Sequence, residues 1–232
     1  MTRGVTEAVH TLIVRLADAL IPQRDQRVVQ ELTGLARQLG AYDVVYRART
    51  AHGFTEWNAR GPRVVLGWAD AEGRRRSLLA HECGHLLFDP LLKPESLEQI
   101  PESERDRWAN AAAGLLECQP DALRKLFSAV QLEDLCDDFA YELVFPDRLA
   151  ARLAPAIDSI EVLSDCRSRM HVTMSVAVLK LNRFRAAEGY PEIGVLQARR
   201  SAGDYWMAAS SCGFPASWRG RVVMTRESSR AL

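Results

Sequence analysis

Two histidines and a glutamate stand at a spacing that can hold and use a metal ion. The run LLAHECGHLLFDP (residues 78–90) contains His81, Glu82 and His85. Side chains four residues apart lie on the same face of an α-helix, so both imidazoles can reach one ion. Glu82 then stands beside that face, where it can accept a proton from water instead of binding the metal. The alternative interpretation is that both histidines are buried and hydrogen-bonded to the backbone.

A zinc ion that activates water has three protein ligands and one open position, so a further ligand must come from elsewhere in the chain. In LEDLCDDFAYELVFP (residues 132–146), Glu133 and Asp137 stand four residues apart on one helical face. Glu133 is the expected third ligand, and Asp137 can accept the free N–H of a ligating histidine. The alternative is a solvated acidic face, because Asp134 and Asp138 stand beside them. Apolar residues fill the rest of this helix, which predicts that it is buried and that its carboxylates need partners.

Other ligand arrangements fit the sequence less well. A metzincin has a glycine three residues after the second histidine and a third histidine six residues after it, but these positions are Phe88 and Leu91. Asp89, one turn after His85, is the other candidate ligand. We interpret it instead as a helix-end group or as a hydrogen-bond partner of a histidine.

The elements that must position these residues follow from apolar periodicity and from the places of proline and glycine. Helices are expected over residues 5–21, 25–39, 74–88, 102–118, 121–130, 131–145 and within 159–186. Strands are expected at 42–48 and 63–68, with short strands in the tail at 205–210 and 221–225 and a frayed end at 226–232. Together these elements predict an α+β fold in which a mostly helical core carries a small sheet.

The composition is that of an ordinary globular protein. The chain has 232 residues, of which 47% are hydrophobic and 26% charged, enough for one sizeable core. The formal net charge is zero, so there is no general attraction to nucleic acid or to anionic lipid. Its cysteines form no C-x-x-C pair, which is typical of reduced thiols, and no uncharged run is long enough to span a bilayer. We therefore expect a cytoplasmic protein that does not insert into membranes, with Cys83 as a small core residue rather than a redox group.

Two motifs at a fixed distance make the sequence similar to a known family. RRRSLLAHECGHLLFDP (residues 74–90), followed by E-x-x-C-D-x-F-A-x-x-L-V-F-P (residues 133–146), resembles the ImmA/IrrE-type zinc metallopeptidases over about residues 25–185. That family carries His-Glu-x-Gly-His-x-Leu-Leu and later Glu-x-x-Ala-Asn-x-Phe-Ala-x-x-Leu-Leu-Met-Pro. Two positions depart from the family pattern: Cys136 stands in place of Ala, and Asp137 in place of Asn. Thermolysin-like zincins also have an aspartate at this place.

The resemblance implies a division of the chain into three parts. A zincin-like metallopeptidase domain is expected over residues 1–150, a helical segment similar to a helix-turn-helix over 151–188, and a short tail with strands over 189–232. Five basic residues give the middle segment a local positive charge: Arg167, Arg169, Lys180, Arg183 and Arg185. They permit DNA binding, but we favour packing of these helices against the peptidase.

The resemblance also implies how the site works. One Zn²⁺ per chain would be held by both histidines and Glu133, with Glu82 as the general base. The strand at 63–68 is similar to the edge strand along which zincins hold an extended peptide. Tyr141, one turn after Asp137, is a candidate for stabilising the oxyanion, although a buried structural tyrosine is the favoured interpretation.

The expected function is that of a cytosolic zinc endopeptidase of narrow specificity, because members of the family cut helix-turn-helix repressors or related regulators. Residues 90–132 separate the second histidine from the third ligand, and we expect their helices to lie near the cleft and to restrict access. One alternative is an antirepressor or binding protein with little turnover, but Glu82 argues against it, because a pure binder needs no general base. The other alternative is a DNA-binding regulator, which the zero net charge disfavours.

Overall fold

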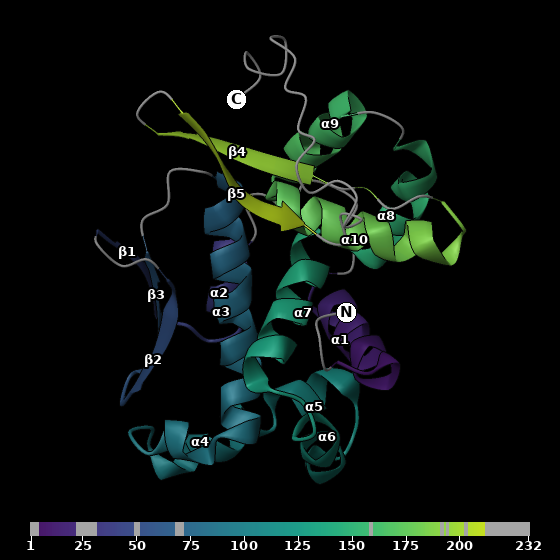
Figure 1. Cartoon of the computed structure of the whole chain (residues 1–232). Coiled ribbons are helices and arrows are strands. Elements are labelled where there is room, and N and C mark those ends of the chain that lie inside the picture. Colours follow the sequence, from purple (N-terminus) through teal and green to yellow (C-terminus); the bar gives the residue numbers. More distant parts are fainter. Residues whose placement is uncertain are drawn as a thin grey trace.

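Two adjacent helices form the centre of the molecule, as Figure 1 shows. They are α3 (Glu72–Leu92) and α7 (Leu132–Val144), and they pack directly against each other. A small sheet lies on the α3 side, and α1 (Glu7–Leu20) packs against α7. The computed structural model describes residues 5–21, 32–48, 52–67, 72–157, 160–190, 193, 195–201 and 204–211. The predicted α+β arrangement, a mostly helical core with a small sheet, is confirmed.

The sheet consists of β1 (Asp43–Arg47), β2 (Phe54–Asn58) and β3 (Gly61–Gly67) in the order β1-β3-β2. β3 pairs in parallel with β1 and antiparallel with β2. Both predicted strands are present, but the expectation that 63–68 is an edge strand is wrong. The consecutive residues Val64–Leu66 are fully buried, as is typical of a strand that is covered on both faces. The edge strand β2 was not expected, because its sequence FTEWN mixes polar and aromatic residues.

The helix α3 continues through Pro90 to Leu92, so the prediction that it ends before Pro90 is wrong. A proline inside a helix removes one backbone hydrogen bond and costs about 3 kcal/mol. Here the missing hydrogen bond is in the last turn of the helix, so only two residues follow it and little of the helix is disturbed. Phe88 and Leu91 are fully buried in that turn, and their packing holds it in the core.

Four short helices connect α3 to α7. They are η2 (Pro94–Leu97), α4 (Glu102–Ala109), α5 (Ala111–Leu116) and α6 (Pro120–Phe127). The single helix expected over 102–118 is therefore two helices, separated at Asn110. The second of them is closed by Glu117, which adopts the left-handed conformation (φ 52°).

Trp108 of α4 fixes this connecting segment to the sheet. Its ring meets the ring of Trp57 on β2 edge-on, with the centroids 5.4 Å apart. It also fills the space beside Gly40, where an added Cβ would lie 2.0 Å from the Trp108 ring. The connecting segment therefore supports β2 from below, in the view of Figure 1.

The chain after α7 adds helices and a hairpin. They are α8 (Asp147–Leu153), η3 (Ala154–Ala156), α9 (Ile160–Met170), α10 (Met174–Ala187) and the antiparallel strands β4 (Val195–Ser201) and β5 (Asp204–Ser211). The helices predicted within 159–186 and the strand at 205–210 are confirmed. The segments 221–225 and 226–232 lie outside the described residues, and so does the first part of the helix expected at 25–39, of which α2 (Leu32–Gln38) is described. No helix in the described part of the chain is long and apolar enough to cross a membrane.

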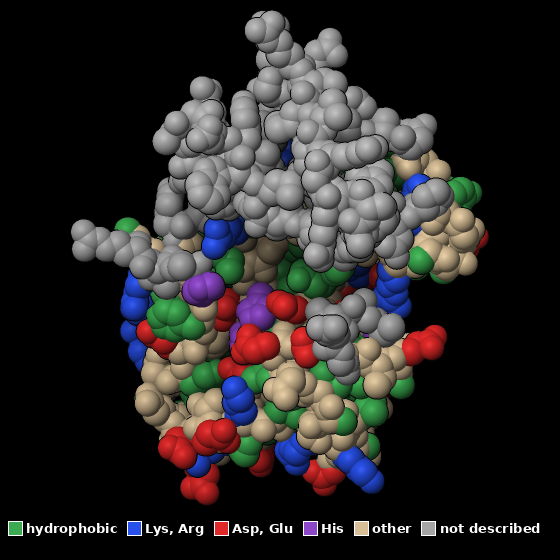
Figure 2. Space-filling model, in the orientation of Figure 1, with side chains coloured by type: hydrophobic (Ala, Val, Ile, Leu, Met, Phe, Trp, Pro, Cys, Tyr) green, Lys and Arg blue, Asp and Glu red, His purple; other side chains and the backbone are tan. Residues whose placement is uncertain are grey.

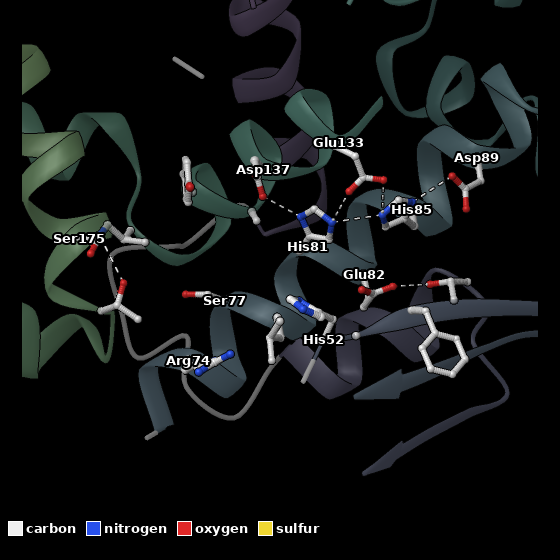
Figure 3. A pocket seen from close by; sticks show the side chains of 18 of the residues that line it. His52, Arg74, Ser77, His81, Glu82, His85, Asp89, Glu133, Asp137 and Ser175 are labelled. Atoms are coloured by element: carbon white, nitrogen blue, oxygen red, sulfur yellow. Dashed lines mark hydrogen bonds and ion pairs between the residues drawn. The ribbon is translucent and has the colours of Figure 1, made fainter. Parts of the chain in front are cut away.

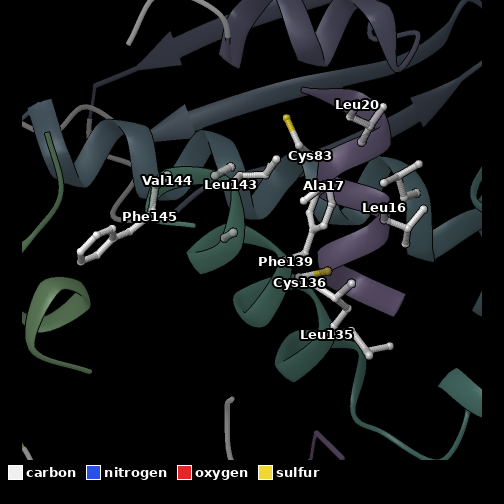
Figure 4. Close-up of a cluster of buried hydrophobic side chains, with 14 of the residues drawn as sticks. Leu16, Ala17, Leu20, Cys83, Leu135, Cys136, Phe139, Leu143, Val144 and Phe145 are labelled. Atoms are coloured by element: carbon white, nitrogen blue, oxygen red, sulfur yellow. The ribbon is translucent and has the colours of Figure 1, made fainter. Parts of the chain in front are cut away.

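One hydrophobic cluster joins α1, α3, α7 and α10, and part of it is drawn in Figure 4. Gly84 allows α3 and α7 to approach closely, because an added Cβ would lie 2.9 Å from the Cα of Cys136. Cys83 and Cys136 are both fully buried, and burial raises the pKa of both thiols. The prediction that Cys83 is a core residue is confirmed.

A buried ionic network joins α7 to α1, α8 and α10. Lys180 of α10 donates to Glu142 Oε2 of α7 (2.7 Å) and also to Asp147 of α8. Asp138 of α7 pairs with His10 of α1. Each buried charge has a partner of opposite sign, and this compensation lets the ions lie inside the fold. The network therefore holds α1, α8 and α10 around α7.

The basic residues of the C-terminal helices are largely used in packing. Lys180 is 2% exposed, and Arg183 Nη1 donates to Asp147 Oδ2 at 2.7 Å. Arg185 is buried and donates to two backbone carbonyls at and just after η3, at 2.7 Å each. Side chains bound in this way are not presented to the phosphates of DNA. These three side chains thus hold the C-terminal helices against the core, whereas Arg169 is exposed and pairs with Asp165 on its own helix.

Candidate metal centre

Two imidazoles and one carboxylate converge between α3 and α7, as Figure 3 shows. The Nε2 atoms of His81 and His85 are 3.2 Å apart. Glu133, in the first turn of α7, places Oε2 3.2 Å from His81 Nε2 and Oε1 3.7 Å from His85 Nε2. In a tetrahedral zinc site with bonds of about 2.0–2.1 Å, neighbouring ligand atoms are about 3.3 Å apart. The spacing of these three groups therefore fits one zinc ion.

The other nitrogen of each imidazole is held by an aspartate. His81 Nδ1 lies 2.8 Å from Asp137 Oδ1, and His85 Nδ1 lies 3.0 Å from Asp89 Oδ1. Each carboxylate accepts the Nδ1 proton, so the two Nε2 lone pairs point at each other and at Glu133. Electron-rich atoms this close repel each other unless a cation lies between them. The donor set therefore suits a metal ion, and Asp89 lies beside a histidine as its hydrogen-bond partner.

Acidic neighbours raise the pKa of both histidines. Burial by itself lowers the pKa of an imidazole, because desolvation disfavours the charged form. For His81 the hydrogen bond and charge of Asp137, with the charges of Glu82 and Glu133, together outweigh burial; for His85 those of Asp89, with the charge of Glu82, do so. The surroundings of both rings therefore favour positive charge, which is the condition for binding a divalent cation.

Glu82 stands apart from the three converging groups and lies against β2. It is 1% exposed and accepts a hydrogen bond from Thr55 Oγ1 at 3.0 Å. Gly53 makes this contact possible, because a Cβ there would lie 2.6 Å from Glu82 Oε1. Burial raises the pKa of Glu82, although the two histidines and Thr55 act in the opposite direction. A buried carboxylate with a raised pKa beside the metal position is suited to accept a proton from water.

A cleft of about 860 Å³ opens over these groups. One face of α3 forms its floor, from Arg74 at one end to Lys93 at the other. The segment His52–Thr55, which leads into β2, forms one wall, and α7 and the start of α10, with Thr173 and Ser175, form the other. Figure 2 shows histidine and acidic side chains gathered at the middle of this face. The sequence did not predict that residues of β2 and α10 line the cleft, because neither segment carries a motif. The glycine just before β2, Gly53, is the one feature of the sequence that could have indicated a close approach there.

Tyr141 lines the same cleft and also packs against the core. Burial raises the pKa of Tyr141 to about 12, and the charges of Asp137 and Asp138 add to the effect. The hydroxyl is therefore protonated at neutral pH and can donate a hydrogen bond into the cleft. The favoured interpretation of a buried structural tyrosine is incomplete, because the side chain also borders the cleft.

The helices of residues 90–132, which were expected near the cleft, do not form its walls. Within this segment, which the structure describes throughout, only Lys93 lines the cleft. The helices α4, α5 and α6 pack against α3, and α5 also packs against α1 (Figure 1). The buried ionic network holds α10 beside α7 instead, so the C-terminal helices supply the wall.

A second group of potential ligands is already neutralised by the chain. His10, Glu142 and Asp147 bring a nitrogen and two carboxylate oxygens close together. Lys180 donates to both carboxylates, so an ammonium group supplies the positive charge that a metal would bring. This cluster is therefore an ion-pair network.

The family comparison agrees with this geometry. The profile of the IrrE N-terminal-like domain (Peptidase_M78) matches residues 35–182, which include α3, α7 and every residue that lines the cleft. The chain belongs to the IrrE N-terminal-like family. A function of the zinc metallopeptidase type goes with this family, as the resemblance of the two motifs implied. No curated protein matches the sequence.

Proposed function

We propose that this member of the IrrE N-terminal-like family is a cytoplasmic zinc endopeptidase of narrow specificity, which cuts a regulatory protein such as a helix-turn-helix repressor. The observation that carries the proposal is the convergence of His81 Nε2, His85 Nε2 and Glu133, with an aspartate on each Nδ1. Zinc bound there would polarise the scissile carbonyl and make the attacking water more acidic. The similarity of both motifs to a family that cuts such regulators supports the choice of substrate.

The chain's own residues would position the peptide and move the proton. β2 is an edge strand whose first residues line the cleft, so an extended peptide can pair with it over Glu82. Glu82 would accept a proton from water and give it to the leaving amine. Tyr141 would donate a hydrogen bond to the oxyanion from the opposite wall.

The two walls of the cleft support narrow specificity. A cleft with β2 on one side and α10 on the other favours an extended segment over a folded surface. Cleavage therefore requires a partner that presents an extended loop or linker. The intact general base supports turnover over the alternative of a binding protein without catalysis.

The test separates the base from the ligand. Glu82→Gln should keep one zinc per chain but lose peptide cleavage by about 10²–10⁴-fold, because only the proton acceptor is removed. Glu133→Ala should lose both zinc and cleavage. Zinc is measured by elemental analysis after reconstitution, and cleavage by mass spectrometry of new peptide ends. A wild-type protein that binds no zinc after reconstitution would overturn the proposal, and equal zinc in both variants would remove Glu133 from the ligand set.

A further inference from the structure

A second cavity, of about 500 Å³, lies beside the cleft between the end of α3, α6 and the start of α7. We call it the basic groove; its lining includes Leu92, Lys93, Arg124, Lys125, Val130 and Leu132. Lys93 lines both the basic groove and the cleft, so the two cavities adjoin at this residue. A peptide that extends from the cleft past Lys93 would therefore come to the basic groove.

The floor of the cleft sets the distance between the groove and the metal position. The cleft follows one face of α3 past His85 and Asp89 to Lys93. Lys93 stands eight residues after His85 in the sequence, which is about 12 Å at the rise of an α-helix. An extended peptide covers that length with about three to four residues. The groove is thus within reach of residues about three to five positions from the bond above the metal.

The charge of the basic groove is positive. Arg124 is held in place, since Nε donates to the Leu91 carbonyl (2.9 Å) and Nη1 to Asp121 Oδ1 (2.8 Å). Asp121, which also lines the groove, thereby neutralises Arg124, but no carboxylate among the described residues forms an ion pair with Lys93 or Lys125. Both lysines are exposed at the rim. The groove therefore offers two cations to a ligand.

The floor of the basic groove is apolar. Leu92 and Leu132 are partly buried, and Val130 is 8% exposed, so they give a hydrophobic surface between the cations. A peptide segment with an apolar side chain and a neighbouring carboxylate matches this combination of surfaces. A nucleic acid fits less well, because the carboxylates of the adjoining cleft, Glu133 among them, would repel its phosphates.

We infer that the basic groove binds an acidic segment of the protein substrate, about three to five residues away from the bond that is cut and on one side of it. This inference rests on the proposed peptidase function. It extends that function by adding a substrate-selecting surface, in which Lys125 and Lys93 bind a substrate Asp or Glu.

The experiment compares cleavage-site profiles of variants. The zinc-reconstituted protein is incubated with a mixed protein pool, native and denatured, and new peptide ends are identified by mass spectrometry. Lys125→Gln and the double change Lys93→Gln with Lys125→Gln remove the groove cations. Arg152→Gln is the matched control, because Lys125 and Arg152 are both exposed cations in the last turn of a short helix, and Arg152 lines neither cavity.

We expect Asp and Glu to be about three- to fivefold more frequent than in the whole pool at positions three to five on one side of the cut. This is the preference that one surface ion pair gives at low salt. The enrichment should fall by at least half in Lys125→Gln, vanish in the double variant and persist in Arg152→Gln. Cleavage without such enrichment, or with equal enrichment in the double variant, would overturn this inference and leave the peptidase function standing. The pool includes helix-turn-helix regulators, native and denatured, and no cleavage of any protein in it would overturn both.

Discussion

Gly53→Ala is the sharpest test of how β2 positions the general base. The added Cβ would lie 2.6 Å from Glu82 Oε1 and 3.0 Å from its Cγ. A methyl carbon and an oxygen normally stay at least about 3.2 Å apart, so one of them must move by about 0.6–0.8 Å. The end of a glutamate side chain usually yields easily. Here Glu82 is 1% exposed and bonded to Thr55, so the movement displaces either the carboxylate or the strand.

The displacement should reduce catalysis far more than stability. Misplacing a catalytic group by 1 Å costs about 10²-fold, so Gly53→Ala should lower kcat/KM by about 10- to 100-fold, or about 1.4–2.7 kcal/mol. The strain of about 1–2 kcal/mol is partly offset, because alanine restricts the unfolded chain by about 0.4–1 kcal/mol. The net loss is thus at most about 1.6 kcal/mol, and the melting temperature should fall by less than about 6 °C.

The assay combines peptide cleavage, zinc content and thermal unfolding. Gly114→Ala is the matched control, because nothing beyond its chain neighbours and the backbone of its own helix lies within 4 Å of a Cβ added there. It lies within α5 and should keep full activity while stabilising the fold by about 0.5–1 kcal/mol. A Gly53→Ala protein with wild-type kcat/KM would refute the reasoning, since Glu82 would then act as base without the observed contact to β2.

Three further outcomes are expected. Asp89→Asn and Asp137→Asn should each weaken zinc affinity by about 10- to 100-fold in a chelator competition assay, because each aspartate orients a ligating histidine; unchanged affinity would exclude that role. Gly84→Ala should lower the free energy of unfolding by about 1–3 kcal/mol in denaturant titration, because the added Cβ meets the α7 backbone at 2.9 Å; a stabilised variant would contradict the close helix contact. The pKa of His10 is raised above 6.5, since its two carboxylate partners outweigh burial. The protonated His10 therefore stabilises the fold fully below pH 6.5, and this stabilisation is lost as pH rises through the folded-state pKa. His10→Gln should flatten the dependence of the melting temperature on pH in that range. An unchanged pH profile would contradict the stabilising role of the His10 charge.

The residues that converge at the metal position could be predicted because each pair lies on one helix. Helical geometry alone puts His81 with His85, and Glu133 with Asp137, on one face each. The distance between the two helices does not follow from either spacing. Gly84 sets it by admitting the backbone of α7, and a glycine inside a helix does not reveal from the sequence which neighbour approaches it.

The walls of the cleft could not be predicted, because they depend on contacts between residues far apart in the chain. β2 has a weak strand pattern, and its place beside Glu82 is supported through Trp57 by Trp108, fifty-one residues later. The helix α10 is held against α7 by Lys180, which the sequence shows only as one of several basic residues. The helix end predicted before Pro90 was wrong for a related reason: tertiary packing of the last turn outweighs the local effect of the proline, and α3 continues to Leu92.

Four of the five carboxylates of α7 divide between two faces, and this division accounts for both the candidate metal centre and the buried network. Glu133 and Asp137 face the histidines of α3, whereas Asp138 and Glu142, each five residues further on, point about 140° away around the helix. On that second face the chain supplies fixed cations, above all Lys180. On the cleft side, the partners of Glu133 and Asp137 among the described residues are imidazoles, and no described lysine or arginine pairs with them. One face of α7 is thus neutralised by the chain itself, and the spacing of the groups on the other face suits a metal ion as the neutralising cation.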